Sequence, residues 1–290
     1  SRLNKLYDQV SLFGTVTVDG SSLASRLGTN TTAVASSADF GNFKVYFVRE
    51  NTNSRNGYFK LVAAQPGDTA ITLTSSVFKE VYNNEAWNLS VRVRPEDYPL
   101  QTFVSGNIEH LEDNKHNKYD VIFSGYKAKT TDLFDSFVAS ASVDTAMGKK
   151  YIESAKRAYV GADRVNVTGD VSYKSDVLAG SLSYWLKALE DSDLRQHALD
   201  LDNIGLSGSG QPLFSMGSTG GDAGSNRMLF VENLGRNTLA LNWNFRNVSG
   251  STTYTAPAQF HVQDFSSGSM RTLRDFGWTG RIAGFHYTGF

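Results

Sequence analysis

The 290-residue chain contains no cysteine and only five prolines. Without cysteine no disulfide can stabilise the fold, which is typical of proteins made in a reducing cytoplasm. No run of about 18 apolar residues is present, so the sequence predicts no membrane span. The first residues also lack the charged and then apolar pattern of a signal peptide. Because residue 1 is serine, we expect a piece of a longer or processed protein.

Charge of both signs is nearly balanced, with 28 basic and 29 acidic residues and a formal net charge of −1. A nucleic-acid-binding surface would need a basic stripe, so we expect no nucleic-acid partner. Enzyme motifs are missing as well: the chain has no GxSxG, no HExxH and no glycine-rich phosphate loop followed by Lys and Ser or Thr. We therefore expect a protein that is not an enzyme.

Glycine is plentiful, with 26 residues, and Tyr, Phe, Val, Thr and Ser dominate the periodic stretches, which favours β-strands. The clearest strand covers residues 86–95, where apolar and polar side chains alternate. We expect its apolar face, with Trp87, to pack in a core and its polar face, with Arg92, to be solvated. Counted together, the chain holds about ten short strands at roughly 10-residue spacing, with one short helix at 192–200. The predicted fold is an all-β antiparallel sandwich.

Composition divides the chain into four parts. Residues 1–38 hold a strand and a polar linker, and 39–205 hold the strand-rich sandwich. Residues 206–227 are rich in Gly and Ser, as in a flexible linker, and 228–290 return to strands as an extension or the start of a next module. The strands at 10–18 and 239–247 are set off from the sandwich. We expect them to pair with neighbouring modules or with other subunits, because unpaired strand edges are normally covered.

The segment from Arg157 to Asp200 carries a resemblance to a known family. It reads YVGAD, a variable loop, and then SLSYWLKALEDSDLRQHALD, in which a strand, an acidic corner and a short helix follow at fixed offsets. This pattern resembles the closing segment of laminin-G-like, concanavalin A-like jelly rolls. Across residues 77–278, segments such as WNLSVRVRPEDYP and FHVQDFSSGS resemble lectin-like parts of long virion structural proteins of tailed bacteriophages, especially marine ones.

The resemblance implies a concanavalin-like jelly roll with strand-rich terminal extensions, in a virion structural protein of the tail, baseplate or capsid surface. Such a protein is non-enzymatic, is assembled in the host cytoplasm and is oligomeric in the virion. Its partners are other virion subunits or neighbouring modules of a longer chain. An alternative is a carbohydrate-binding module that recognises a host surface glycan. A remoter alternative is a glycan-cleaving enzyme, although no strand carries the paired carboxylates that glycosidases need.

Lectin-like sugar sites place an aromatic ring beside Asp or Asn acceptors, because one face of a sugar is apolar and its hydroxyls need fixed partners. Candidates at the predicted loop edges are Tyr98, Tyr126, Asp163 and Tyr173. Each of them could instead pack over the rim of the sandwich. Asp163 and Asp170 flank a loop suited to a Ca²⁺ site of the laminin-G kind, but two carboxylates fall short of the six or more oxygens required. The sequence otherwise predicts no cofactor and no metal.

Overall fold

The computed structural model describes residues 8–17, 41–52, 54–64, 71–83, 85–96, 103–104, 107–108, 118–129, 132–153, 156–164, 171–175, 177–200, 239–250 and 260–264. They belong to two compact units. Unit 1 comprises Ser1–Gly125 and Asp135–Val177, and unit 2 comprises Tyr126–Phe134 and Leu178–Phe290. In both units the strands pair antiparallel, as the sequence predicts.

The larger sheet of unit 1 has five strands in the order β10-β1-β2-β3-β4. β2 and β3 form a hairpin with the residue pairs in unbroken register, from Arg49 opposite Gly57 to Asn42 opposite Ala64. β2 therefore lies inside the sheet, as its two bulky faces indicate. The strands are β1 (Gln9–Thr17), β2 (Asn42–Arg49), β3 (Gly57–Ala64), β4 (Ile71–Thr74) and β10 (Lys156–Val160).

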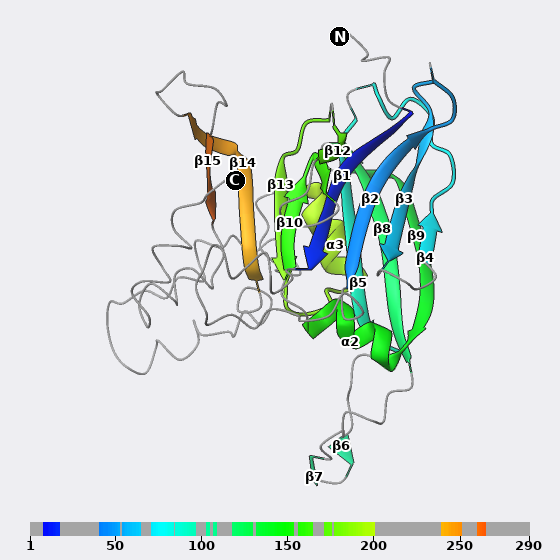
Figure 1. Cartoon of the computed structure of the whole chain (residues 1–290), viewed down its shortest axis with the longest axis vertical. Helices are drawn as coiled ribbons and strands as arrows, with labels where there is room; N and C mark the ends of the chain where they lie inside the picture. Colours follow the sequence, from blue (N-terminus) through cyan, green and yellow to red (C-terminus); the bar gives the residue numbers. More distant parts are fainter. Residues whose placement is uncertain are drawn as a thin grey trace. The chain divides into compact units, whose positions relative to one another are not determined.

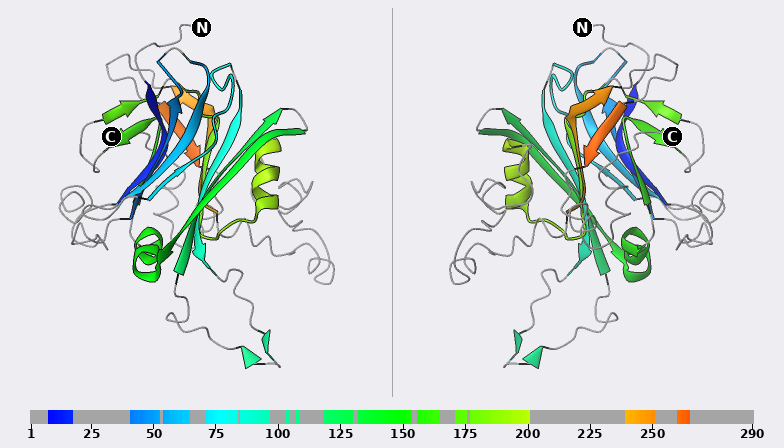
Figure 2. Two further views of the ribbon diagram at one scale, coloured as in Figure 1. Left: turned by 90° about the vertical axis from the view of Figure 1, so that its right-hand side faces the viewer. Right: turned by 90° about the vertical axis from the view of Figure 1, so that its left-hand side faces the viewer.

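A second sheet has the order β5-β8-β9 and consists of β5 (Trp87–Pro95), β8 (Lys118–Lys129) and β9 (Asp132–Asp144). It belongs to unit 1 except for residues 126–129 and 132–134, which are assigned to unit 2. The blue strands of the first sheet and the cyan and green strands of the second form two layers (Figure 2). Apolar side chains of both layers share one core, in which Val45, Leu61 and Phe123 have no exposed surface. This arrangement confirms the predicted antiparallel sandwich.

An aromatic cluster fills the core between the two sheets. Phe59 of β3 stacks on Phe137 of β9 with ring centroids 5.6 Å apart, and Trp87 of β5 lies 4.9 Å from Phe59. Phe78, which follows β4, lies 4.7 Å from Trp87. Ring pairs of this kind stabilise a core by about 0.5–1.5 kcal/mol each beyond the burial of their surface. Trp87 thus lies on the core face of β5, as the alternation predicts.

The helix α2 (Thr145–Glu153) lies at the foot of the sheets in Figure 1. It begins directly after β9, where Asp144 Oδ1 accepts a hydrogen bond of 2.7 Å from the N–H of Met147 and so caps the first turn. Tyr151 of α2 is buried in the core. Gly148 packs so closely on the ring of Tyr119 that a Cβ at this position would clash. The helix therefore closes one end of the sandwich.

Unit 2 contains the sheet β13-β14-β15 and the helix α3 (Asp191–Leu199). Leu194 of α3 is buried and packs with Leu189 and Tyr126. This helix is the one predicted at 192–200. Among the described residues, neither α2 nor α3 is long and apolar enough to cross a membrane. The strands of unit 2 are β13 (Ser181–Trp185), β14 (Leu239–Gly250) and β15 (Phe260–Asp264).

Two short hairpins complete the described part of unit 1. One pairs β6 (Phe103–Val104) with β7 (Asn107–Ile108). The other pairs β11 (Ala162–Arg164) with β12 (Val171–Lys174) and follows directly after β10.

The expectation that both terminal strands pair outside the chain is wrong. β1 pairs with β2 on one side and with β10 on the other. β14 pairs with β13 and with β15. Because both edges of each strand are occupied within this chain, their backbone groups are satisfied without a neighbouring module. The boundary of the units at 177–178 also falls inside the predicted sandwich of 39–205. The predicted linker at 206–227 lies outside the described residues.

The polar face of β5 differs from the prediction as well. The alternation predicts a solvated face, whereas Arg92 is only 7% exposed. On the same face, the hydroxyl oxygen of Ser90 lies 2.7 Å from that of Ser124 on β8, at hydrogen-bond distance. A period of two separates the faces of a strand, but it does not show whether the polar one is covered.

Candidate functional site

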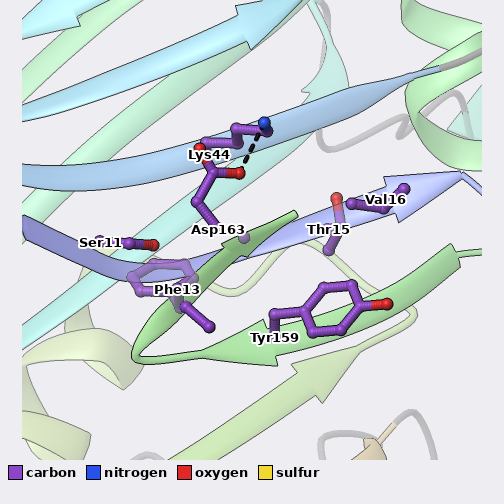
Figure 3. A pocket seen from close by; sticks show the side chains of 9 residues that line it. Ser11, Phe13, Thr15, Val16, Lys44, Tyr159 and Asp163 are labelled. Atoms are coloured by element: carbon purple, nitrogen blue, oxygen red, sulfur yellow. Dashed lines mark ion pairs between the residues drawn. The ribbon is translucent and has the colours of Figure 1, made fainter. Parts of the chain in front are cut away.

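A buried charge pair lies on the outer face of the five-stranded sheet. Val45 and Phe47 of β2 point into the core, so Lys44 and Tyr46, which alternate with them, point to the opposite face. There Asp163 of β11 meets both side chains. Its Oδ1 lies 2.6 Å from Nζ of Lys44 (Figure 3). Its Oδ2 accepts a hydrogen bond of 2.7 Å from the Tyr46 hydroxyl. We call these three residues the Asp163 cluster.

The path of β11 depends on a sharp turn after β10. Gly161 has a φ of 68°, a left-handed conformation that residues with a Cβ rarely adopt. Its N–H donates a hydrogen bond of 2.8 Å to the carbonyl of Leu12, and its own carbonyl accepts one of 3.0 Å from the N–H of Ser175. Leu12 lies at a β-bulge of β1, where the register with β2 shifts. The bulge and the glycine thus lead the chain from the sheet edge onto the outer face.

A small pocket lies beside the cluster, with room for about one water molecule. Gly14 stands between Lys44 on β2 and Tyr159 on β10, and its missing side chain leaves space between them. A Cβ on Gly14 would come within 2.8 Å of the Phe43 carbonyl oxygen. The pocket is too small for a sugar ring. Its other lining residues include Ser11, Phe13, Thr15, Val16 and Asp163 (Figure 3).

Burial determines what the Asp163 cluster can do. The Asp163 side chain is 4% exposed and that of Lys44 is 24% exposed. A carboxylate buried this far costs several kcal/mol unless it is paired and hydrogen-bonded, and here the ammonium and the phenol hydroxyl fill both roles. The cluster therefore holds the β11–β12 hairpin against the sheet.

The same geometry bears on the calcium site that the resemblance implies. A calcium ion bound at Asp163 would have to displace the Lys44 ammonium, so the arrangement does not favour it. Asp170 lies outside the described residues. In the described ranges, no group of three or more His, Asp or Glu side chains converges as a metal site.

The structure brings only two of the predicted sugar-site residues together. Tyr173 lies directly opposite Asp163 in the pairing of β12 with β11, so their backbones are neighbours in one hairpin. Tyr98 lies outside the described residues. Tyr126 belongs to unit 2, where it is 2% exposed and packs in a small apolar cluster. Its ring is therefore not available to stack on a sugar.

Sequence reasoning identifies Asp163 but not its partners. Tyr46 and Asp163 are separated by 117 positions, and nothing in either segment indicates the other. The available signal was the run at 42–49, where both faces of the strand carry bulky side chains. A lysine on the covered face of an inner strand needs a carboxylate, because lysines are almost never buried without a partner.

Unit 2 holds a stacked pair of a different kind. The imidazole of His197 on α3 lies on the indole of Trp185 on β13, with ring centroids 5.5 Å apart and an interplanar angle of 17°. Burial lowers the pKa of His197 below its ordinary value, while the carboxylates of Asp193 and Asp200 act in the opposite direction. The neutral imidazole is therefore the form that this stack favours.

We expect unit 2 to lose stability as the pH falls below about 6.5, the ordinary pKa of histidine. The pKa of His197 is lower in the folded state, so the unfolded state binds the proton first as the pH falls. Proton binding therefore stabilises the unfolded state relative to the folded one. The variant His197→Phe keeps a ring on Trp185 and should lose this part of the pH dependence. Urea denaturation at about pH 8 and about pH 5, followed by tryptophan fluorescence, measures it. An equal loss of stability in both proteins contradicts the prediction.

Comparisons of this chain with known proteins found no match. No protein-family model matches the chain, and no curated protein or solved structure is similar enough to count as a match. The suggested family therefore rests on the sequence segments alone.

Proposed function

We propose that this chain is a structural component of a tailed-bacteriophage virion, in which the sandwich of unit 1 is a rigid lectin-like module. The observation that carries the proposal is where the resembling segments lie. The segment WNLSVRVRP forms β5, and YVGAD forms the turn from β10 into β11 that ends on the Asp163 cluster. These segments are framework elements of the sandwich, which is what a shared module would preserve.

A module of this kind acts through its shape and its contacts. One core joins both sheets, and the Lys44–Asp163 pair fixes a hairpin on the outer face. Such a unit would serve as a building block of the tail, baseplate or capsid surface, with other subunits as partners. The proposal assigns no catalytic step to the chain.

The experiment is an analysis of purified particles of the phage that encodes the chain. We expect its peptides in amounts comparable with those of other structural proteins after a wash in about 1 M salt, which screens surface charges almost completely. Antibodies against unit 1 should label one location on the particle in electron micrographs. Abundance in the infected-cell lysate together with absence from washed particles contradicts the proposal.

Carbohydrate binding is the second candidate function, and Tyr173 on the β11–β12 hairpin is its candidate residue. Tyr173 lies opposite Asp163, which is held in place by Lys44 and Tyr46. With both carboxylate oxygens engaged, Asp163 would position the hairpin and would not itself accept sugar hydroxyls. A glycan array with the whole chain tests this role. Binding that is lost in Tyr173→Ala and kept in the control Tyr184→Ala supports it, and no binding to any host glycan removes it.

A further inference from the structure

The two larger sheets, β10-β1-β2-β3-β4 and β5-β8-β9, have four edge strands in the described part of the chain, and three of them are protected against pairing with another chain. β4 has only four residues. β10 has five, of which Lys156 and Arg157 are charged. β5 carries Arg92 and Arg94 and ends on Pro95. Short length, charge and proline are the usual means by which an edge strand avoids such pairing.

The fourth edge strand, β9, has none of these features along most of its length. It has 13 residues, and its charged residues are Asp132, Asp135 and Asp144, near the two ends. Residues 136–143 contain no charge and no proline. On the face away from the core, Val138 is 59% exposed. A long uncharged edge offers a row of backbone N–H and C=O groups to another strand.

We propose that β9 pairs with β9 of a second copy of this chain, antiparallel and about a two-fold axis at Ser140. The two β5-β8-β9 sheets would then form one continuous sheet. This register sets Phe137 opposite the partner's Val143, and Ala139 opposite the partner's Ala141. Both pairs lie on the core face, where Phe137 and Val143 are already buried. The inference goes beyond the virion proposal and holds whether or not the chain belongs to a particle.

Charge disfavours the registers whose axis lies earlier in β9. A pairing continues the sheet only if core-facing residues stand opposite core-facing residues, because a slip by one residue exchanges the faces. An axis two residues earlier would set Asp132 directly opposite the partner's Asp144, and like charges in that position are destabilising. An axis one residue earlier would set Asp135 opposite the partner's Val143, a core position. With the axis at Ser140, the paired segment covers residues 136–144, so Asp135 lies outside it.

The segment is therefore complementary to itself, and a two-fold pairing is the commonest way for two identical chains to associate. Roughly nine residues a side would pair, fewer than the 20–30 of a standard interface. We expect a weak dimer that forms at high protein concentration and dissociates on dilution.

Single cysteines report on the register, because the chain has none of its own. Ser140→Cys sets two thiols opposite each other with Cβ atoms about 4.5–5.5 Å apart, close to disulfide distance. Ser136→Cys is the matched control, an exposed serine on the same face that would lie about 26 Å from its counterpart. Under mild oxidation we expect at least about tenfold more cross-linked dimer from Ser140→Cys than from Ser136→Cys, because the thiols of the control would be too far apart to form a disulfide. Equal cross-linking of the two variants, or none, overturns the proposal.

Light scattering tests the dimer itself. The unmodified chain is compared at about 100 µM and about 1 µM, concentrations above and below the dissociation constant expected of a weak dimer. Ser140→Lys and Ser140→Asp each put like charges at the axis and should be monomeric, while an equimolar mixture should recover the dimer. Circular dichroism and the thermal midpoint of each variant show that the fold is kept, as expected at an exposed position. A monomeric wild-type chain at the higher concentration overturns the proposal, as does a Ser140→Lys variant that dimerises normally.

Discussion

Replacing Trp87 by alanine should lower the free energy of unfolding of unit 1 by about 3 kcal/mol. This is the lower end of the usual cost of deleting a large core aromatic, because the Trp87 side chain is only partly buried. The indole lies among Phe59, Phe78 and Phe137, at centroid distances of 4.9, 4.7 and 6.3 Å. Its loss would leave a cavity where the two sheets meet, and rings held by several strands cannot collapse into it. Urea denaturation at pH 7 measures the change.

The control for this variant is Trp87→Phe. The indole N–H of Trp87 is buried and finds no hydrogen-bond partner among the described residues, so phenylalanine keeps the ring packing and removes an unsatisfied donor. We expect a loss of at most about 1.5 kcal/mol. If alanine were as well tolerated as phenylalanine, Trp87 would not be part of the core and the register of β5 would be wrong.

The second large effect is expected from Lys44→Met, which should cost about 2–4 kcal/mol. Removing one partner of a buried ion pair costs about 3–5 kcal/mol, because the other charge stays buried and uncompensated. We set the value lower because the Lys44 side chain is 24% exposed and water screens part of the interaction. The amide protons of the β11–β12 hairpin should exchange faster in this variant, since the cluster holds the hairpin to the sheet.

A double variant separates the charge from the packing. In Lys44→Met with Asp163→Asn no charge remains, and the amide oxygen of asparagine can still accept a hydrogen bond from Tyr46. We expect the double variant to be more stable than Lys44→Met alone, although it carries one more substitution. Lys118→Met, an exposed lysine of the same unit, should change stability by less than about 0.5 kcal/mol. Additive losses in the double variant would show that Asp163 does not depend on Lys44.

Local signals were sufficient for the elements whose pattern is complete within a few residues. Strict alternation predicts a strand at 86–95, and the structure has β5 at Trp87–Pro95. An acidic start followed by apolar residues at helical spacing predicts a helix at 192–200, and α3 covers Asp191–Leu199. In both cases the side-chain period and the capping residues lie inside the element itself.

Pairing between distant strands is what the sequence did not indicate. The alternation around Val10 and Val16 predicts a strand, yet it does not show that β1 lies between β2 and β10, whose residues follow far along the chain. The same limit applies to the candidate site. Asp163 stands out as an acidic residue at a predicted loop edge, but its partners on β2 become visible only when the strands are placed.

Because β1 is an inner strand of its sheet, its two edges are paired at different times during synthesis. β1 is made before the other strands of its sheet and can pair with β2 once Arg49 has left the ribosome. Its other edge stays open until β10 is complete at Val160, about 110 residues later. At about 5–20 residues per second this takes roughly 5–20 s. The nascent chain therefore carries an inner strand with one open edge during that interval, when it is most exposed to association with its neighbours on the same messenger RNA.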